Sequence, residues 1–239
     1  MSRPRARNLI LSGGIQHDFP PAARALANCL NAADIQSTIS EDLDSTWAGI
    51  ASGSWDLVTL HALRWRMTQH EKYAPHRDRW AYEIPQVGRA ALWSHVQRGG
   101  GLLGLHTAAL CFDTWDQWGE LLGVSWRWGE SFHPELGVIH VAPTSTAHPV
   151  TEGIAAFDTV DEVYHALNVH TAAPTLLTSM DQPLFWAYAH APTHGLGRVV
   201  YDALGHDADA IEQPTHATLL RRSAAWLLQR SDDEVRALR

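Results

Sequence analysis

The chain has 239 residues, of which 45% are hydrophobic and 18% are charged, a composition that supports a packed globular core and excludes an intrinsically disordered protein. Its 18 lysines and arginines are outnumbered by 26 aspartates and glutamates, and the net charge of −8 argues against nucleic acid or an anionic membrane as a partner. With two cysteines and no CxxC spacing, the sequence predicts neither a disulfide framework nor a zinc ribbon, and a reduced cytoplasmic protein is the simplest interpretation.

The chain is expected to form one domain. No run approaches the roughly 18 consecutive apolar residues of a transmembrane helix, and the start of the chain lacks the apolar centre of a signal peptide. Repeats, low-complexity tracts and long linkers are absent as well, so we assign residues 1–239 to a single domain. Residues 1–7, which include three arginines, are predicted to be a flexible tail.

The first half of the chain alternates short apolar runs with helical patterns. We expect a helix that begins at Pro21, a second helix at 82–98, and strands at 8–12, 35–40, 56–61 and 101–106. Apolar runs that alternate with helices are typical of parallel sheets. The pattern therefore predicts a parallel sheet covered by helices on both faces.

The second half is richer in strand signals. Five further strands are expected before a last helix at 214–229, and these strands lie at 137–142, 162–167, 175–179, 183–189 and 198–204.

The segment 64–80 interrupts this pattern directly after the third expected strand. Loops that follow the carboxyl end of a strand are the usual place for lids and binding segments. We therefore expect Arg64 to border a pocket as a hydrogen-bond donor and Trp65 to border it as a stacking face. A merely solvated insertion is the alternative, because loops are polar in any case.

Histidines follow four of the expected strands. His17 follows the first strand, His61 the third, His106 the fourth and His206 the strand at 198–204. Sites in open parallel sheets form outside the carboxyl ends of the strands, so these four side chains are predicted to converge. Histidine supplies acid–base groups and metal ligands near neutral pH, although such a residue can also be structural, with its ring simply hydrogen-bonded.

The segment 104–108 carries the clearest chemical signal. Small residues flank a turn between a strand and a helix, which is the layout of a nucleophile elbow. His106 stands at the apex, where serine or cysteine usually attacks a carbonyl, and an imidazole there suits proton transfer or metal ligation instead. Cys111 lies beyond the turn and is predicted to be a small buried residue rather than a nucleophile.

Four motifs occur in order along the chain, namely GGGLLGLH (99–106), HPVT (148–151), DEVY (161–164) and GRVVYDALGH (197–206). Together they resemble the ThuA-like (trehalose utilisation) family of the class I glutamine amidotransferase-like superfamily, over residues 8–228. The resemblance implies a flavodoxin-like three-layer α/β fold, with a mostly parallel central sheet and antiparallel additions in the second half. It also implies a role in carbohydrate catabolism, on a sugar or a keto-glycoside.

The same comparison argues against glutamine amidotransferase activity. Those enzymes carry a cysteine at the elbow and a His-Pro-Glu motif on a late strand, whereas His106 replaces the cysteine here. His133, Pro134 and Glu135 spell the second motif but come too soon after the elbow, and His206 occupies the equivalent place in chain order. We therefore expect His133 at most to line the pocket.

Two chemical uses of these residues stay open. In the first, His106, His206 and Glu162 are the catalytic groups, because a carboxylate beside histidines can orient an imidazole or act as a base. In the second, a divalent metal such as zinc is bound by His106, His206 and His216, since three imidazoles with one open position are typical of catalytic zinc. The substrate-binding residues are expected to be His17, His61, Arg64, Trp65, Trp128 and His133.

A non-catalytic sugar-binding or regulatory protein on the same fold is the alternative to an enzyme. Convergence of His106, His206 and Glu162 around a pocket favours an enzyme, and scatter of these residues favours a binder. The expected partner is a small sugar in either case. The sequence leaves the oligomeric state open, a homo-oligomer included.

Overall fold

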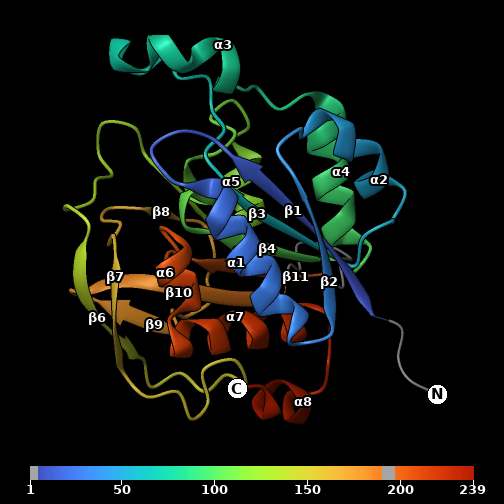
Figure 1. The fold of residues 1–239 in the computed structure, drawn as a ribbon, viewed down its shortest axis with the longest axis vertical. Coiled ribbons are helices and arrows are strands. Elements are labelled where there is room, and N and C mark those ends of the chain that lie inside the picture. Colours follow the sequence, from blue (N-terminus) through green and yellow to red (C-terminus); the bar gives the residue numbers. More distant parts are fainter. Residues whose placement is uncertain (1–4, 190–196) are drawn as a thin grey trace.

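The fold is built on a nine-stranded mixed sheet, seen in a computed structural model that describes residues 5–189 and 197–239 (Figure 1). The strand order is β2-β1-β3-β4-β11-β10-β9-β6-β7. The first five strands in this order are parallel, and they are β2 (Ile35–Ser40), β1 (Ala6–Gly13), β3 (Leu57–Ala62), β4 (Gly101–Leu105) and β11 (Arg198–Asp202). This is the flavodoxin-like order, which confirms the predicted fold class.

The other four strands extend the sheet in antiparallel fashion. They are β10 (Gln182–Ala189), β9 (Leu177–Ser179), β6 (Gly137–Pro143) and β7 (Phe157–Asp161). The antiparallel additions therefore lie in the second half of the chain, as predicted. A separate pair, β5 (Val124–Ser125) and β8 (Asn168–Val169), forms a small second sheet.

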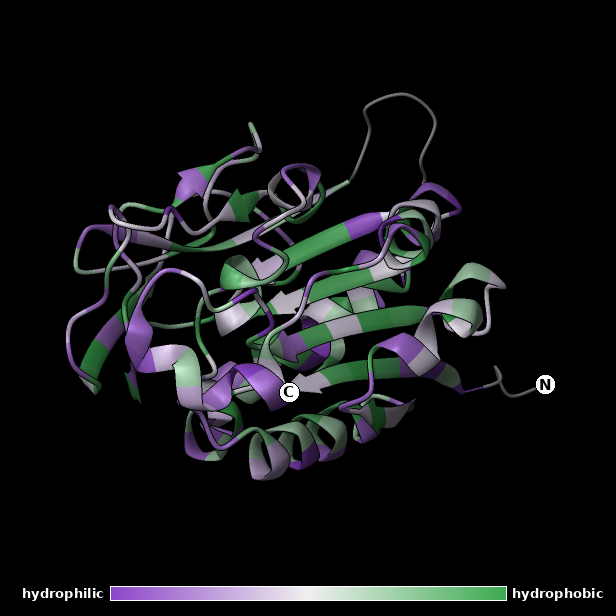
Figure 2. Ribbon diagram, turned by 90° about the horizontal axis from the view of Figure 1, so that it is seen from above, coloured by the Kyte–Doolittle hydropathy of each residue, from purple (hydrophilic) through white to green (hydrophobic). Residues whose placement is uncertain are grey.

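Helices cover both faces of the parallel half (Figures 1 and 2). One face carries α1 (Phe19–Asn31), α6 (Ala208–Glu212) and α7 (Pro214–Leu227), and the short α8 (Asp232–Ala237) packs on α7. The other face carries α2 (Trp47–Ala51), α4 (Gln86–Gln97) and α5 (Gln117–Leu122). None of the described helices combines the length and apolar character needed to cross a membrane.

The strands in the middle of the sheet are buried because helices lie on both sides of them. Every residue of β3 and β4 is buried, and Figure 2 shows these central strands as mostly hydrophobic while the helices carry polar outer faces. Burial on both faces explains why these strands have continuous apolar sequences rather than alternating ones.

Some expected boundaries differ from the structure. The helix expected at 82–98 begins at Gln86, since Pro85 caps it and disfavours helical backbone in the residue before it. The strand expected at 162–167 does not form, and β7 lies at Phe157–Asp161 instead. The predicted tail is wrong for Ala6 and Arg7, which pair with β2, while residues 1–4 lie outside the described part of the chain.

Candidate functional site

The turn after β4 forms as the sequence predicts and carries His106 at its apex. His106 has a φ of +47°, a left-handed conformation that is uncommon outside glycine, and it begins the 3₁₀ helix η3 (His106–Leu110). The Tyr201 hydroxyl donates a hydrogen bond to the His106 carbonyl at 3.0 Å. Gly104 is needed in the strand before the turn, because a Cβ there would collide with the Leu122 side chain. Packing on both sides therefore fixes the backbone that presents His106.

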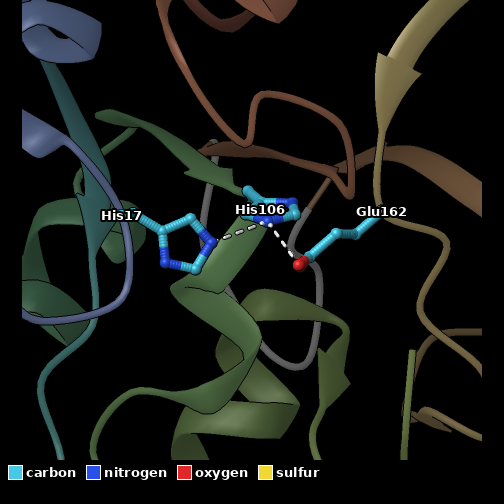
Figure 3. Close-up of side chains that lie close together, drawn as sticks. All are labelled: His17, His106 and Glu162. Carbon is cyan, nitrogen blue, oxygen red and sulfur yellow. Dashed lines mark hydrogen bonds and ion pairs between the residues drawn. The ribbon is translucent and has the colours of Figure 1, made fainter. Parts of the chain in front are cut away.

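The protonation pattern of the His106 ring follows from its neighbours. Nδ1 lies 2.7 Å from the carbonyl oxygen of Ala203, which can only accept, so Nδ1 carries the proton. Nε2 then faces His17 Nε2 at 3.1 Å and Glu162 Oε2 at 3.4 Å (Figure 3). The Tyr164 hydroxyl lies 3.0 Å from the same nitrogen. In the neutral ring, Nε2 is thus an acceptor at the centre of the cluster, and the Tyr164 hydroxyl can donate to it.

Glu162 is the carboxylate of this cluster and directly follows the end of β7. Besides its contact with His106, its Oε1 lies 3.3 Å from His133 Nδ1 and 3.6 Å from His206 Nε2. Burial favours the neutral acid, but the hydrogen bond and charge of His106, together with His133 and His206, lower the pKa of Glu162. Glu162 is therefore an ionised carboxylate between three imidazoles at neutral pH.

Asp161 joins the two loops that carry Glu162 and His206. Its Oδ1 accepts the backbone N–H of Glu162 at 2.8 Å, and its Oδ2 accepts the backbone N–H of Gly205 at 2.7 Å. Burial raises the pKa of Asp161. For His106, burial alone would lower the pKa, but the Glu162 hydrogen bond and the charge of Asp161, 3.8 Å from Nδ1, outweigh burial and raise it.

A cavity of about 310 Å³ opens beside Glu162. Its wall is largely aromatic: Trp65 stacks on Trp128 with ring centroids 5.6 Å apart, and Tyr73 and Trp126 complete this side. The remaining wall residues are Gln16, His17, Leu63, Lys72, Thr107, Leu110, His133, Glu162 and Tyr164. An apolar wall with a few convergent polar groups is typical of small-molecule sites.

Of the expected substrate-binding residues, His17, Trp65, Trp128 and His133 line this cavity, and His61 and Arg64 do not. Arg64 is buried against the protein itself, where its guanidinium donates to the Glu41 carbonyl at 2.7 Å and stacks on Trp80. His61 is wholly buried beneath Phe19 and donates Nε2–H to the Gly205 carbonyl. Both side chains satisfy backbone groups, which turns them away from the cavity.

The segment 64–80 is buried only at Arg64, Trp65 and Met67, and its remaining residues are exposed or half-buried, as in a solvated insertion. It contains the 3₁₀ helix η2 (Glu71–His76) and α3 (Arg77–Trp80), which project from the body of the molecule (Figure 1). Trp65 and Met67 pack with Ile15, Phe19 and Leu63 in a small apolar cluster that is separate from the main core. Trp65 therefore serves as a core residue and as cavity wall at once.

The expected metal ligands do not come together as a set. His216 is wholly buried at the start of α7, where Nδ1 lies 2.7 Å from the Ala210 carbonyl and Nε2 lies 3.0 Å from Asp202 Oδ2. Both ring nitrogens are engaged, so His216 has none left for a metal shared with His106 and His206. His106 itself is fully buried and is not in the cavity wall, so it can act on a bound molecule only through neighbours such as Glu162.

Cys111 is buried and its thiol donates to the Ala62 carbonyl at 3.1 Å, as expected for a structural residue. Burial raises its pKa to about 12, so the reactive thiolate is scarce at neutral pH. We expect iodoacetamide to modify the folded protein slowly, and Cys111→Ala to change substrate turnover less than about twofold. Mass spectrometry and kinetics of the treated protein check this. Turnover that disappears in step with alkylation of Cys111 would show the thiol to be the nucleophile.

Acid is expected to destabilise the protein through His61. Its Nε2–H is used by Gly205, and its Nδ1 has no hydrogen-bond partner among the described residues, so a second proton would be buried without an acceptor. Burial, with the charge of His106, lowers the pKa of His61 from 6.5 to about 3. Between pH 6.5 and about 3, His61 is protonated in the unfolded chain and neutral in the folded protein. The free energy of unfolding should therefore decrease as the pH is lowered, by about 1.4 kcal/mol per pH unit for this histidine.

Urea unfolding at pH 6.5, 5.5 and 4.5 measures this slope. The His61→Gln variant should show a shallower pH dependence than the wild type by about the same 1.4 kcal/mol per unit. His140→Gln is the matched control, because His140 is exposed and should leave the slope unchanged. Identical slopes for wild type and His61→Gln would contradict the assignment.

The family model for ThuA, trehalose utilisation, matches residues 7–227. Among solved structures, a putative ThuA-like protein from Parabacteroides merdae aligns with a TM-score of 0.72 and 16% identity, over 95% of this chain and 90% of that chain. A cytoplasmic protein from Salmonella typhimurium LT2 aligns with a TM-score of 0.62 and 13% identity, over 92% and 99%. A glutamine amidotransferase from Thermotoga maritima aligns with a TM-score of 0.52 and 11% identity, over 94% and 84%.

At these identities the structural matches establish the fold alone, and no curated protein matches the sequence. The family match is of a different kind, because it spans nearly the whole chain and includes the elbow, Glu162 and His206. The chain belongs to the ThuA (trehalose utilisation) family.

Proposed function

We propose that this protein is an enzyme of carbohydrate catabolism that processes a sugar or keto-glycoside in the cytoplasm, with Glu162 as the group that acts on the substrate. The observation that carries the proposal is an ionised carboxylate in the wall of an aromatic cavity, held by three imidazoles. The cytoplasmic assignment is supported by the Salmonella typhimurium protein of the same fold, which is described as cytoplasmic.

The cavity suits a sugar ring. Tryptophan and tyrosine faces bury the apolar C–H surface of a sugar, while polar wall groups such as Gln16, Lys72 and Thr107 can bind hydroxyls. A carbonyl on the sugar would acidify the neighbouring C–H, and Glu162 is the cavity-wall carboxylate that can accept that proton. His133, 3.3 Å from Glu162 and partly exposed, is placed to return a proton to the product.

A sugar-binding or regulatory protein is the second candidate. It is favoured by one observation, namely that the elbow holds a fully buried histidine where the superfamily enzymes carry a cysteine nucleophile. The two candidates are separated by incubating the purified protein with a panel of sugars and keto-glycosides and following product formation by mass spectrometry. Turnover of a panel member supports the enzyme, whereas saturable binding without turnover supports the binder.

Either candidate predicts that Trp128→Ala weakens sugar binding by about tenfold, because a half-buried stacking face is lost from the wall. Isothermal titration calorimetry with the best panel member measures this. Trp93→Ala is the matched control, since Trp93 is similarly half-buried but lies on α4, away from this cavity. Equal affinity in both variants would place the sugar elsewhere.

A further inference from the structure

We propose that His17, His106 and Glu162 bind a divalent transition-metal ion, with zinc as the ion that this ligand set suits. The two imidazoles and the carboxylate point toward one another (Figure 3), and one ligand atom from each residue lies within 4.8 Å of the others. The three residues come from separate places in the chain: after β1, at the elbow after β4 and after β7.

The arrangement of ring protons leaves two lone pairs facing each other. The His106 ring donates Nδ1–H to the Ala203 carbonyl, and His17 Nδ1 lies 3.5 Å from the Ile15 carbonyl, which can also only accept. When both rings are neutral with the proton on Nδ1, each presents an unprotonated Nε2, and the two Nε2 atoms are 3.1 Å apart. A cation between the two nitrogens would bind both lone pairs, in place of the Tyr164 hydroxyl that lies 3.0 Å from His106 Nε2.

A metal ion satisfies this arrangement better than a proton does. A proton links two acceptors, whereas three ligand atoms converge here, since Glu162 Oε2 lies 3.4 Å from His106 Nε2. In a tetrahedral zinc site with bonds of about 2.0–2.1 Å, neighbouring ligand atoms lie roughly 3.3–3.4 Å apart. The two spacings from His106 Nε2, 3.1 Å to His17 and 3.4 Å to Glu162, match that geometry, and the ligand atoms of His17 and Glu162 lie within 4.8 Å of each other. Two histidines and one glutamate are also a known ligand set of catalytic zinc.

The surroundings support a cation as well. Metal-binding histidines usually donate their other N–H to a backbone carbonyl or a carboxylate, which fixes the ring and makes it a better ligand. His106 does this through Ala203, with the buried Asp161 carboxylate 3.8 Å from the same Nδ1. Asp161 and Glu162 together supply negative charge that offsets the positive charge of a divalent ion.

The site would leave a coordination position toward the cavity, because His17 and Glu162 both lie in the cavity wall. An ion there polarises a carbonyl oxygen of a bound molecule. This chemical use rests on the proposed function, in which that molecule is a keto-glycoside. Glu162 would bind the ion through Oε2, and its Oε1, which faces His133 and His206, would remain the proton acceptor of the proposed function. Metal binding itself needs no substrate and is testable without one.

The test uses the full chain without a histidine tag, dialysed against a chelator and titrated with zinc chloride in a calorimeter. We expect one saturable site in the wild type. His17→Ala and Glu162→Gln should each weaken zinc binding by at least about 100-fold, more than the loss of an outer partner usually does. Circular dichroism and the thermal midpoint confirm that each variant is folded. His106→Ala is avoided because His106 shapes the buried elbow.

Two matched variants make the result specific. His140→Ala removes an exposed histidine that also contacts a carboxylate, Asp158, and should bind zinc like the wild type. His206→Ala removes the neighbouring imidazole outside the proposed ligand set and should retain one site. Co²⁺ substitution gives a second readout, since intense visible bands of the wild type should be lost in Glu162→Gln.

Three outcomes would overturn the inference: no stoichiometric binding in the wild type, unchanged binding in both ligand variants, or loss of binding in His140→Ala or His206→Ala alone. The readout is separate from that of the proposed function. One bound zinc without turnover of any sugar contradicts the proposed enzyme only, and full turnover by a chain that binds no metal contradicts this inference only.

Discussion

Glu162→Gln is expected to lower the turnover of the keto-glycoside by about a hundred- to ten-thousand-fold, the usual contribution of a positioned acid–base group. The amide has the same shape but cannot accept a proton or carry the charge that His106, His133 and His206 surround. The variant should fold, because Glu162 is held through its backbone N–H by Asp161 rather than through its side chain alone.

The measurement is kcat and KM for wild type and variant on the substrate found in the panel. Glu152→Gln is the control, since the side chain of Glu152 is exposed and paired with Arg236 away from the cavity. The pH profile adds a second check: the carboxylate has a lowered pKa, so wild-type activity should not fall through Glu162 until the pH is below about 4.5, the ordinary value for glutamate. Retention of wild-type kcat by Glu162→Gln would remove this residue from the chemistry.

Asp202→Ala is expected to lower the free energy of unfolding by about 3–5 kcal/mol, the usual cost of removing one partner of a buried ion pair. Asp202 and His216 are both wholly buried, with Oδ2 and Nε2 3.0 Å apart. Asp202 Oδ1 also accepts the backbone N–H of Leu204 at 3.0 Å, so the variant leaves a buried imidazole and a buried amide without their partner.

The pH dependence of this effect has a definite sign. Burial would lower the pKa of His216, but the charge and hydrogen bond of Asp202 outweigh burial and raise it. A raised folded-state pKa adds stability that is fully present below about 6.5 and is lost as the pH rises through the folded value. Urea unfolding should therefore show the largest gap between wild type and Asp202→Ala near pH 6, and a smaller gap at higher pH.

The chain offers a matched control in His140 and Asp158, an ion pair of the same residue types that is about two-thirds exposed. Asp158→Ala should change stability by less than about 1 kcal/mol, because surface ion pairs contribute little. A similar loss in both variants, or a gap that widens with pH for Asp202→Ala, would show that burial of the charge pair is not the cause.

The parallel half of the fold was predictable because its strands are buried on both faces and have continuous apolar sequences. The strand expected at 35–40 coincides with β2, the one expected at 56–61 is shifted by one residue from β3, and the one expected at 101–106 ends one residue after β4. The strand β7 was not predicted, because its inward positions include Thr159 and Asp161 and its outward positions include Val160. Its sequence thus lacks the apolar-in, polar-out pattern on which such predictions rest.

The site was predictable where strand ends determine it. His17 and His206 converge beside His106 because each follows a parallel strand, and Glu162 joins them from the end of β7. Arg64 and His216 were placed wrongly, since their directions depend on which backbone carbonyl or carboxylate each side chain reaches. Tyr164 lies in the third motif, but its sequence position does not indicate its contact with His106, and nothing in the sequence of 64–80 marks Tyr73 as cavity wall.

The Asp161 carboxylate connects the end of β7 to the loop after β11, beside the reacting groups. One of its oxygens accepts the backbone N–H of Glu162, and the other accepts the backbone N–H of Gly205, next to His206. The spacing of carboxylate and imidazole is thereby set by main chain, and substitutions on the aromatic side can reshape the cavity without disturbing it. The half-buried Tyr73 and Trp128 can therefore change with the sugar while the spacing of the reacting groups stays the same, whereas Trp65 is also held by the apolar cluster.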